Sequence, residues 1–344
     1  MPLPDYDPSA LTLWIMGPGM GELVIVRAPP GRWLVVDGCG VDRRGCAQRI
    51  LDHYGATPHA AVFSHPHLDH ARGLEEVISK ATRPEQSDWP RLGMLLPPGN
   101  RGAGDLWDRQ TGHDAGVVEQ VVATIVDRWR SRPACHWQLQ EDQKESLGEA
   151  EMVVLSPNER VITAAQGRYR NGKTFDPNRM ASAMSIRWRE RTVLLGSDLP
   201  EVPGKAWSRL ARQRPDIATH DVYKIAHHTS STAIGPQVGA ASGLERVWVA
   251  TPFSSSGHPR FADGAGVDLL LRSQTPLAIT GLSRPHADQH GAPWHTTRSV
   301  LRDAPDIEFD VPSAGFPDCY VMVTLPEVGA PAISFGPGSI RVSR

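Results

Sequence analysis

The 344-residue sequence lacks the features that would assign it to a membrane or a secreted protein. It contains no run of about 18 consecutive apolar residues, so we expect no membrane-spanning helix and no membrane partner. The N-terminal sequence MPLPDYDPSA has neither a basic start nor an apolar stretch, so we expect no secretory signal peptide. These two absences predict a cytoplasmic protein.

Cysteine and net charge are also scarce. The sequence contains no C-x-x-C pair, and its cysteines are Cys39, Cys46, Cys135 and Cys319. We interpret them as reduced thiols, mostly buried, rather than as a disulfide framework. The formal net charge is -2, which argues against a protein that coats nucleic acid or membrane through bulk charge. A local basic groove is not excluded.

Apolar runs alternate with amphipathic segments along the chain. Runs such as AAVFS (60–64) and EMVVLSP (151–157) predict buried strands, whereas periodic segments at about 43–54 and 117–132 predict helices. Segment 158–180 is polar and is expected to be a loop. With no repeat and no low-complexity linker, we expect one domain over residues 1–344, with sheets inside and helices outside. The remaining expected features are helices at about 68–81, 202–213 and 263–273, a long surface insertion at 82–116 and a strand-rich C-terminal extension at 275–344.

The sequence HPHLDH places several ligand-capable side chains directly after the strand AAVFS. His65 and His67 alternate on an extended segment and can point the same way, while Asp69 and His70 begin a helix and can point back toward them. Imidazole and carboxylate groups are the ligands of Zn²⁺ and also suit Mn²⁺ or Fe. If these ligands are divided between two ions, the pair can hold a bridging hydroxide and clamp a displaced oxygen. We therefore predict a two-metal site.

Further ligands are expected at the ends of later strands. Asp198 follows the strand RTVLLGS and is the candidate bridging ligand; alternatively it caps the next helix. His227 and His228 end the strand DVYKIAHH, so one can bind metal while the other holds a substrate phosphate or acts as an acid. Because neighbouring residues of a strand face opposite sides, one of the two can instead pack in the core. His258 is a candidate proton donor or a surface residue, and Asp37 either supports a ligand histidine or forms a turn.

These pieces together resemble the metallo-β-lactamase fold superfamily. The resemblance rests on VVDGCG (35–40), SHPHLDHARGL (64–74), VLLGSDLP (193–200) and AHHTSS (226–231). Over residues 11–275 their order is similar to that in the metallo-hydrolase domain of bacterial DNA-internalisation competence proteins. The resemblance implies an α/β fold, a four-layer αββα metallo-β-lactamase sandwich, with two divalent metal ions, Zn or Mn, at one edge between the sheets.

The resemblance also implies a role for each residue. His65 and His67 would bind the first metal ion, Asp69, His70 and His228 would bind the second, and Asp198 would bridge the two. His227 would contact the scissile phosphate. Asp69, His227 and His258 are therefore the expected catalytic residues.

Two departures from the superfamily pattern bear on this assignment. Many superfamily hydrolases have a third histidine at the first metal, where this sequence has Asn178, as the competence-like group tends to have. His113 in TGHDAG is a rival third ligand, but it comes too early in the chain. The second departure is HHTSS, where the family usually has glycine after the histidine pair, and this change is expected to narrow the pocket.

The leading functional prediction is a metal-dependent phosphodiesterase, specifically a nuclease. Arginines and tryptophans in RPEQSDWPR (83–91) and GNRGAGDLWDR (99–109) either contact a nucleic-acid strand or belong to a loop whose tryptophans are anchored in the core. One alternative is a metallo-hydrolase of esters, thioesters or lactones. The other is a metal-binding subunit of a multi-protein system, such as anti-phage defence, active only with protein partners from the same operon. The competence proteins carry their domain beside a membrane channel that this sequence lacks, so we do not expect a role in DNA uptake to transfer.

Overall fold

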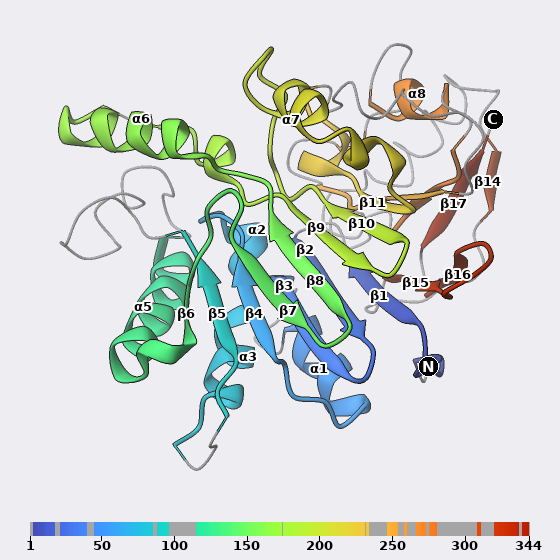
Figure 1. Cartoon of the computed structure of the whole chain (residues 1–344), viewed down its shortest axis with the longest axis horizontal. Helices are drawn as coiled ribbons and strands as arrows, with labels where there is room; N and C mark the ends of the chain where they lie inside the picture. Colours follow the sequence, from blue (N-terminus) through green and yellow to red (C-terminus); the bar gives the residue numbers. More distant parts are fainter. Residues whose placement is uncertain are drawn as a thin grey trace, which may run out of the picture.

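Two β-sheets form the centre of the protein, and helices lie on their outer faces (Figure 1). The structure is a computed structural model. It describes residues 3–17, 21–39, 45–84, 88–95, 115–173, 175–230, 232–233, 246–253, 258–259, 266–272, 275–280, 308–310, 320–336 and 339–343.

The first sheet has eight strands in the order β16-β15-β1-β2-β3-β4-β5-β6. Their bounds are β1 Leu11–Met16, β2 Gly21–Ala28, β3 Arg32–Cys39, β4 Ala60–Phe63, β5 Arg91–Met94, β6 His136–Gln138, β15 Tyr320–Leu325 and β16 Ala332–Phe335. Strands β3, β4, β5 and β6 run parallel to one another, and the remaining neighbours are antiparallel.

The second sheet has nine strands in the order β14-β17-β13-β12-β11-β10-β9-β8-β7. Their bounds are β7 Lys144–Leu147, β8 Ala150–Val154, β9 Met184–Trp188, β10 Arg191–Leu195, β11 Val222–Lys224, β12 Val247–Ala250, β13 Leu277–Ile279, β14 Glu308–Asp310 and β17 Ile340–Ser343. Strands β10 to β13 run parallel. The described strands of the C-terminal segment pair within both sheets, so this segment is an integral part of the sandwich.

The helices complete the outer layers. The α-helices are α1 Cys46–His53, α2 Leu68–Ala71, α3 Leu74–Ala81, α5 Ala115–Ser131, α6 Glu159–Arg170, α7 Trp207–Gln213 and α8 Gly266–Leu271. The short 3₁₀ segments are η2 Pro133–Cys135, η3 Pro177–Met180, η4 Pro215–Thr219 and η5 Ala226–Thr229.

The apolar side chains form separate layers that define the architecture. Alternate residues of a strand point to opposite faces, so Leu13 packs between the sheets while its neighbour Trp14 packs outward against α1, α3 and α5. In the second sheet, Val249 likewise faces the central core, and Trp248 faces α7 and α8. Burial of both faces explains why the strand sequences are continuous apolar runs. The predicted αββα arrangement is confirmed.

The prediction of a loop at 158–180 is wrong, because residues 159–170 form helix α6. The Oδ1 atom of Asn158 caps this helix by accepting a hydrogen bond of 3.0 Å from the backbone N–H of Val161. Among the described side chains of α6, a narrow stripe of Val161, Ile162 and Ala165 packs in an apolar cluster, and most of the other side chains are polar. So thin an apolar stripe gives little periodic signal.

No helix in the described part of the chain is long and apolar enough to cross a membrane. The thiols of Cys39, Cys46 and Cys135 are buried, as predicted, and Cys319 lies outside the described residues.

His220 is expected to make the stability of the protein depend on pH. Its buried ring donates from Nδ1 to the carbonyl of Ile217 (2.8 Å) and accepts at Nε2 from the indole N–H of Trp248 (2.9 Å), so the ring is held neutral. Burial lowers the pKa of His220 to about 4. The unfolded chain takes up a proton below pH about 6.5, whereas the folded protein does not, so stability falls as the pH drops from about 6.5 toward 4.

Between pH 7 and pH 5 this loss should amount to about 2 kcal/mol in the free energy of unfolding. Urea unfolding of the wild type and of His220→Gln at both pH values measures it. The variant should lose less stability than the wild type on acidification, and an equal loss in both proteins would refute the assignment.

Candidate metal centre

The predicted site residues gather where parallel strands end. Asp37 lies near the carboxyl end of β3, His65 follows β4, Asp198 follows β10, and η5 follows β11. Within each sheet these strands are parallel neighbours, so their carboxyl ends lie at the same edge. Contacts such as that from Ser182 N–H to the Ser64 carbonyl (3.1 Å) join the two sheets here. The site therefore lies at the edge where the two sheets meet.

The HPHLDH segment turns sharply after β4. His67 is extended (φ -113°, ψ 151°), and helix α2 begins at the next residue, so Asp69 and His70 turn back over the strand end. The predicted single helix at 68–81 is instead two helices, α2 and α3, separated by Gly73 with φ +79°. A Cβ on Gly73 would lie 2.4 Å from the Cα of Gly45, so glycine is required for this close approach.

The carboxylate of Asp198 lies between two sets of histidines. Its Oδ2 atom is 3.7 Å from Nε2 of His65, and its Oδ1 atom is 3.5 Å from Nε2 of His70 and 3.7 Å from Nε2 of His228. All four side chains are at most 3% exposed. One carboxylate is thus shared by two groups of potential ligands.

Asp69 and His67 complete the two groups. Oδ2 of Asp69 is 3.5 Å from Nε2 of His70 and 3.2 Å from Nε2 of His228, on the side where Asp198 also lies. Nδ1 of His67 is 3.0 Å from Nε2 of His65. The ligand atoms of His65, His67 and Asp198 all lie within 4.8 Å of one another. We call these three residues the first group, and Asp69, His70, Asp198 and His228 the second group.

Hydrogen bonds fix which ring nitrogen of each second-group histidine is protonated. Nδ1 of His70 donates to Asp37 Oδ2 (2.8 Å), and Nδ1 of His228 donates to the carbonyl of Thr251 (3.1 Å). In the neutral rings the Nε2 lone pairs therefore face the oxygens of Asp198. Acceptors that face acceptors repel one another unless a cation lies between them.

The second group fits a divalent metal ion. Nε2 of His70 and Oδ1 of Asp198 are buried, and neither makes a hydrogen bond to a described residue. Buried polar atoms of this kind are rarely left without a partner. Imidazole nitrogens and carboxylate oxygens are the donor set of Zn²⁺, Mn²⁺ and Fe.

The pKa shifts of His70 and Asp198 indicate that the carboxylates of the site favour a positive charge among them. Burial alone would lower the pKa of His70, but the carboxylates of Asp69, Asp37 and Asp198 raise it well above its usual value. Burial would raise the pKa of Asp198, yet His228 and His70 hold it well below its usual range. Without metal, a proton on His70 supplies the positive charge that the carboxylates demand.

Asp37 bonds to His70, which is one of the two roles that the sequence left open for it. Its carboxylate accepts from the backbone N–H of Ser64 (2.7 Å) and the hydroxyl of Ser64 (2.6 Å) as well as from His70. The hydroxyl of Ser197, next to Asp198, donates to the hydroxyl of Ser64 (2.8 Å). Asp37 therefore holds His70 in place and links it, through Ser64, to the segment that carries Asp198.

His227 and His228 do not lie on a strand, so the predicted alternation between them is wrong. β11 ends at Lys224, and both histidines lie in η5 with φ of 47° and 52°, followed by Thr229 at 67°. The hydrogen bond from His227 N–H to the Ser197 carbonyl (2.8 Å) helps to hold this unusual backbone. Left-handed conformations of non-glycine residues are uncommon and cluster at functional sites.

The remaining predicted catalytic residues, His227 and His258, lie beside the second group. The ring centre of His227 is 6.5 Å from that of His228 and 6.5 Å from that of His258. The amide of Asn178 lies 3.3 Å from Nε2 of His227. Asn178 therefore contacts His227, and no described residue supplies a third histidine to the first group.

Sequence reasoning missed a buried ion pair beneath the second group. Glu22 of β2 pairs with Lys224 of β11, and its Oε2 atom also accepts from the hydroxyl of Thr251 (3.1 Å). Glu22 is 3.9 Å from Nδ1 of His228, the nitrogen already bonded to Thr251. One of its carboxylate oxygens also lies within 4.8 Å of ligand atoms of His70, Asp198 and His228, so Glu22 is a further potential ligand of this group. The sequence did contain a signal for this ion pair, because Glu22 and Lys224 are charged residues within largely apolar strands.

The described part of the arginine- and tryptophan-rich segment lies at the amino end of β5, opposite to the carboxyl ends of the strands that lead to the site. Arg91 begins β5, which is parallel to β4, and it pairs with Glu145 (3.1 Å). The indole of Trp89 packs against the guanidinium of Arg132 (4.3 Å). Arg91 and Trp89 are therefore not placed to contact a nucleic-acid strand bound at the candidate metal site. His113 and residues 99–109 lie outside the described residues.

Comparison with known proteins gives weak structural likeness only. No protein-family model matches the chain, and no curated protein matches it. The diiron β-hydroxylase CmlA from Streptomyces venezuelae is similar over 66% of this chain and 36% of its own, with 15% identity and a TM-score of 0.34. This chain thus spans about a third of CmlA.

Two further solved structures are similar at the same level. The metallo-β-lactamase fold protein YhfI from Bacillus subtilis has 14% identity and a TM-score of 0.32 over 62% of this chain and 70% of its own. A metallo-β-lactamase from Cronobacter sakazakii has 15% identity and a TM-score of 0.34 over 61% of this chain and 73% of its own.

Asp37→Asn should weaken metal binding while leaving every ligand in place. Both carboxylate oxygens of Asp37 act as acceptors, and an amide offers only one, so His70 or Ser64 loses its partner. We expect the affinity for Zn²⁺ or Mn²⁺ to fall about 10- to 100-fold in calorimetric titration.

The matched control is Asp221→Asn. Asp221 accepts from Arg191 (2.7 Å) and from the backbone N–H of Thr192 (2.7 Å), and it directly precedes β11, at the opposite end of that strand from η5. This variant should lose stability but keep its metal affinity. Equal affinities for Asp37→Asn and the wild type would contradict the role of Asp37.

Proposed function

We propose that the protein is a metal-dependent phosphodiesterase of the metallo-β-lactamase fold superfamily, specifically a nuclease that uses two Zn²⁺ or Mn²⁺ ions. The proposal rests on the position of the Asp198 carboxylate. One of its oxygens lies beside His65 of the first group, and the other lies beside His70 and His228 of the second group. A shared carboxylate is suited to hold two ions side by side. When bound, such ions supply Lewis-acid chemistry, because they lower the pKa of water and neutralise charge that develops on phosphate oxygens.

The incomplete first group favours a catalytic centre over a structural one. His65, His67 and Asp198 are the candidate ligands of this group among the described residues, and Asn178, which stands where many superfamily hydrolases have a third histidine, contacts His227 instead. Structural zinc sites are usually filled by protein ligands, whereas catalytic sites leave a position for water or substrate. A substrate oxygen can therefore be accommodated at the first group.

His227 is suited to contact the phosphate as a neutral donor. Burial lowers the pKa of His227, so the ring is uncharged at neutral pH. When the amide of Asn178 donates to Nε2, the ring proton is on Nδ1, which makes no hydrogen bond to a described residue. Asn178 thereby orients His227. His258, whose ring lies near that of His227, is our candidate to give a proton to the leaving oxygen.

The test is cleavage of single- and double-stranded DNA with added Mn²⁺ or Zn²⁺. The variant Asp198→Asn keeps the size of the side chain but removes the charge shared by the two groups. We expect its cleavage rate to fall at least about 1,000-fold, in line with the loss of a central electrostatic element. The matched control, His136→Ala, alters an exposed histidine of β6 and should leave the rate unchanged.

The other outcomes separate the alternatives. Folded, metal-loaded protein that cleaves no DNA with either ion contradicts the nuclease proposal. Hydrolysis of esters, thioesters or lactones under the same conditions, lost in Asp198→Asn, would favour the second hydrolase class. Activity that appears only when proteins from the same operon are added would favour a partner-dependent subunit.

A further inference from the structure

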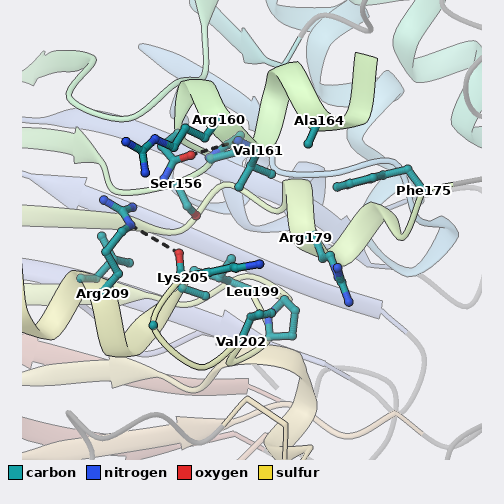
Figure 2. Close-up of a pocket in the computed structure, with 16 residues that line it drawn as sticks. Ser156, Arg160, Val161, Ala164, Phe175, Arg179, Leu199, Val202, Lys205 and Arg209 are labelled. Atoms are coloured by element: carbon teal, nitrogen blue, oxygen red, sulfur yellow. Dashed lines mark hydrogen bonds between the residues drawn. The ribbon is translucent and has the colours of Figure 1, made fainter. Parts of the chain in front are cut away.

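A cavity lies beside the metal centre, and none of the proposed catalytic residues lines it. It has a volume of about 370 Å³ and lies between α6 and the segment from Leu199 to Leu210. Figure 2 shows Val161 and Phe175 on one side of the cavity and Val202 on the other. Small-molecule sites are typically apolar cavities of about 300–1,000 Å³, so this one is large enough for a single small organic group.

The charged groups that line the cavity are all basic. They are Arg160, Arg179, Lys205 and Arg209. Arg209 forms an ion pair of 2.6 Å with Glu141, and Arg179 lies 3.8 Å from Asp176. Arg160 and Lys205 are exposed, and neither is paired with a carboxylate among the described residues. The capped N-terminus of α6 at Asn158 adds the positive end of a helix dipole to the same wall.

Two segments join the cavity to the metal centre. Leu199 and Pro200, which line the cavity, directly follow Asp198. Arg179, which also lines it, directly follows Asn178, whose amide contacts His227. Consecutive Cα atoms are about 3.8 Å apart, so the cavity wall begins one residue from the shared carboxylate and one residue from Asn178. The cavity therefore adjoins the two segments that carry Asp198 and Asn178.

We infer that the cavity binds the nucleotide next to the scissile phosphodiester, with the base against the apolar walls and the phosphates beside Arg160, Arg179 and Lys205. This inference rests on the phosphodiesterase proposed above. The two properties of the cavity select this ligand class together. Apolar walls favour a flat, poorly hydrated body such as a base, which stacks on aromatic and aliphatic side chains. Arg160 and Lys205, which are exposed and pair with no carboxylate among the described residues, favour an anion such as phosphate.

Other substrates of a hydrolase would use only one of these properties. An uncharged acyl chain or lactone gains nothing from the basic side chains, and an inorganic anion gains nothing from Val161 and Phe175. The cavity volume also limits the bound part to about one nucleotide. The cavity therefore selects the nucleotide that adjoins the cleaved bond, while the rest of a strand lies outside it.

The test is calorimetric titration of EDTA-treated, full-length protein with adenosine 5′-monophosphate. Removal of metal ensures that the metal centre does not hold the phosphate. We expect Arg160→Gln to weaken binding about tenfold, because a charge-assisted contact is lost. Val161→Trp fills the cavity and should abolish binding. The matched control is Arg170→Gln, which removes an exposed cation from the other end of the same helix and should bind like the wild type.

Circular dichroism and metal titration establish that each variant is folded, and Arg160→Gln alters an exposed side chain that folding does not require. The inference is overturned when wild-type protein that cleaves phosphodiesters binds the nucleotide no better than Arg160→Gln and Val161→Trp do. Failure of the proposed function gives a different result from failure of this inference. Nucleotide binding lost in these variants, in a protein that cleaves no phosphodiester, would overturn the proposed function and leave the cavity as a nucleotide site.

Discussion

The structure depends on the convergence of acceptor atoms around Asp198. Each second-group histidine gives its Nδ1 proton to a fixed partner, His70 to Asp37 and His228 to Thr251, so the opposite nitrogens face carboxylate oxygens at 3.2–3.7 Å. Such a cluster is unstable without positive charge because its members are buried and repel one another. In the metal-free protein the carboxylates of Asp69, Asp37 and Asp198 raise the pKa of His70, which favours a proton on that ring.

The fold brings these groups together by joining two sheets at one edge. The first sheet supplies Asp37 and the HPHLDH segment, and the second supplies Asp198 and η5. Polar contacts across the interface fix their relative positions, among them the buried pair of Glu22 and Lys224 beside His228. Burying a charged pair is costly unless its geometry is well satisfied, and Glu22 gains a further hydrogen bond from Thr251. The site is thus held by both halves of the sandwich.

Features with strong local signals were predictable from sequence. The spacing of His65, His67, Asp69 and His70, and the position of Asp198 after an apolar strand, indicated which residues would meet. Features set by tertiary contacts were not predictable. The left-handed backbone of His227 and His228 depends on contacts to Ser197 and Thr251, and the split between α2 and α3 depends on a close approach to Gly45. Helix α6 was missed because little of its surface is apolar, and it supplies one wall of the basic cavity.

The proposed function requires that Asp198 joins two metal ions in one centre. Anomalous diffraction from crystals grown with Mn²⁺ measures this most directly. We expect two anomalous peaks per chain, one beside His65 and His67 and one beside His70 and His228, with the Asp198 carboxylate between them. A single peak, or metal bound without Asp198, would contradict the proposed two-metal centre.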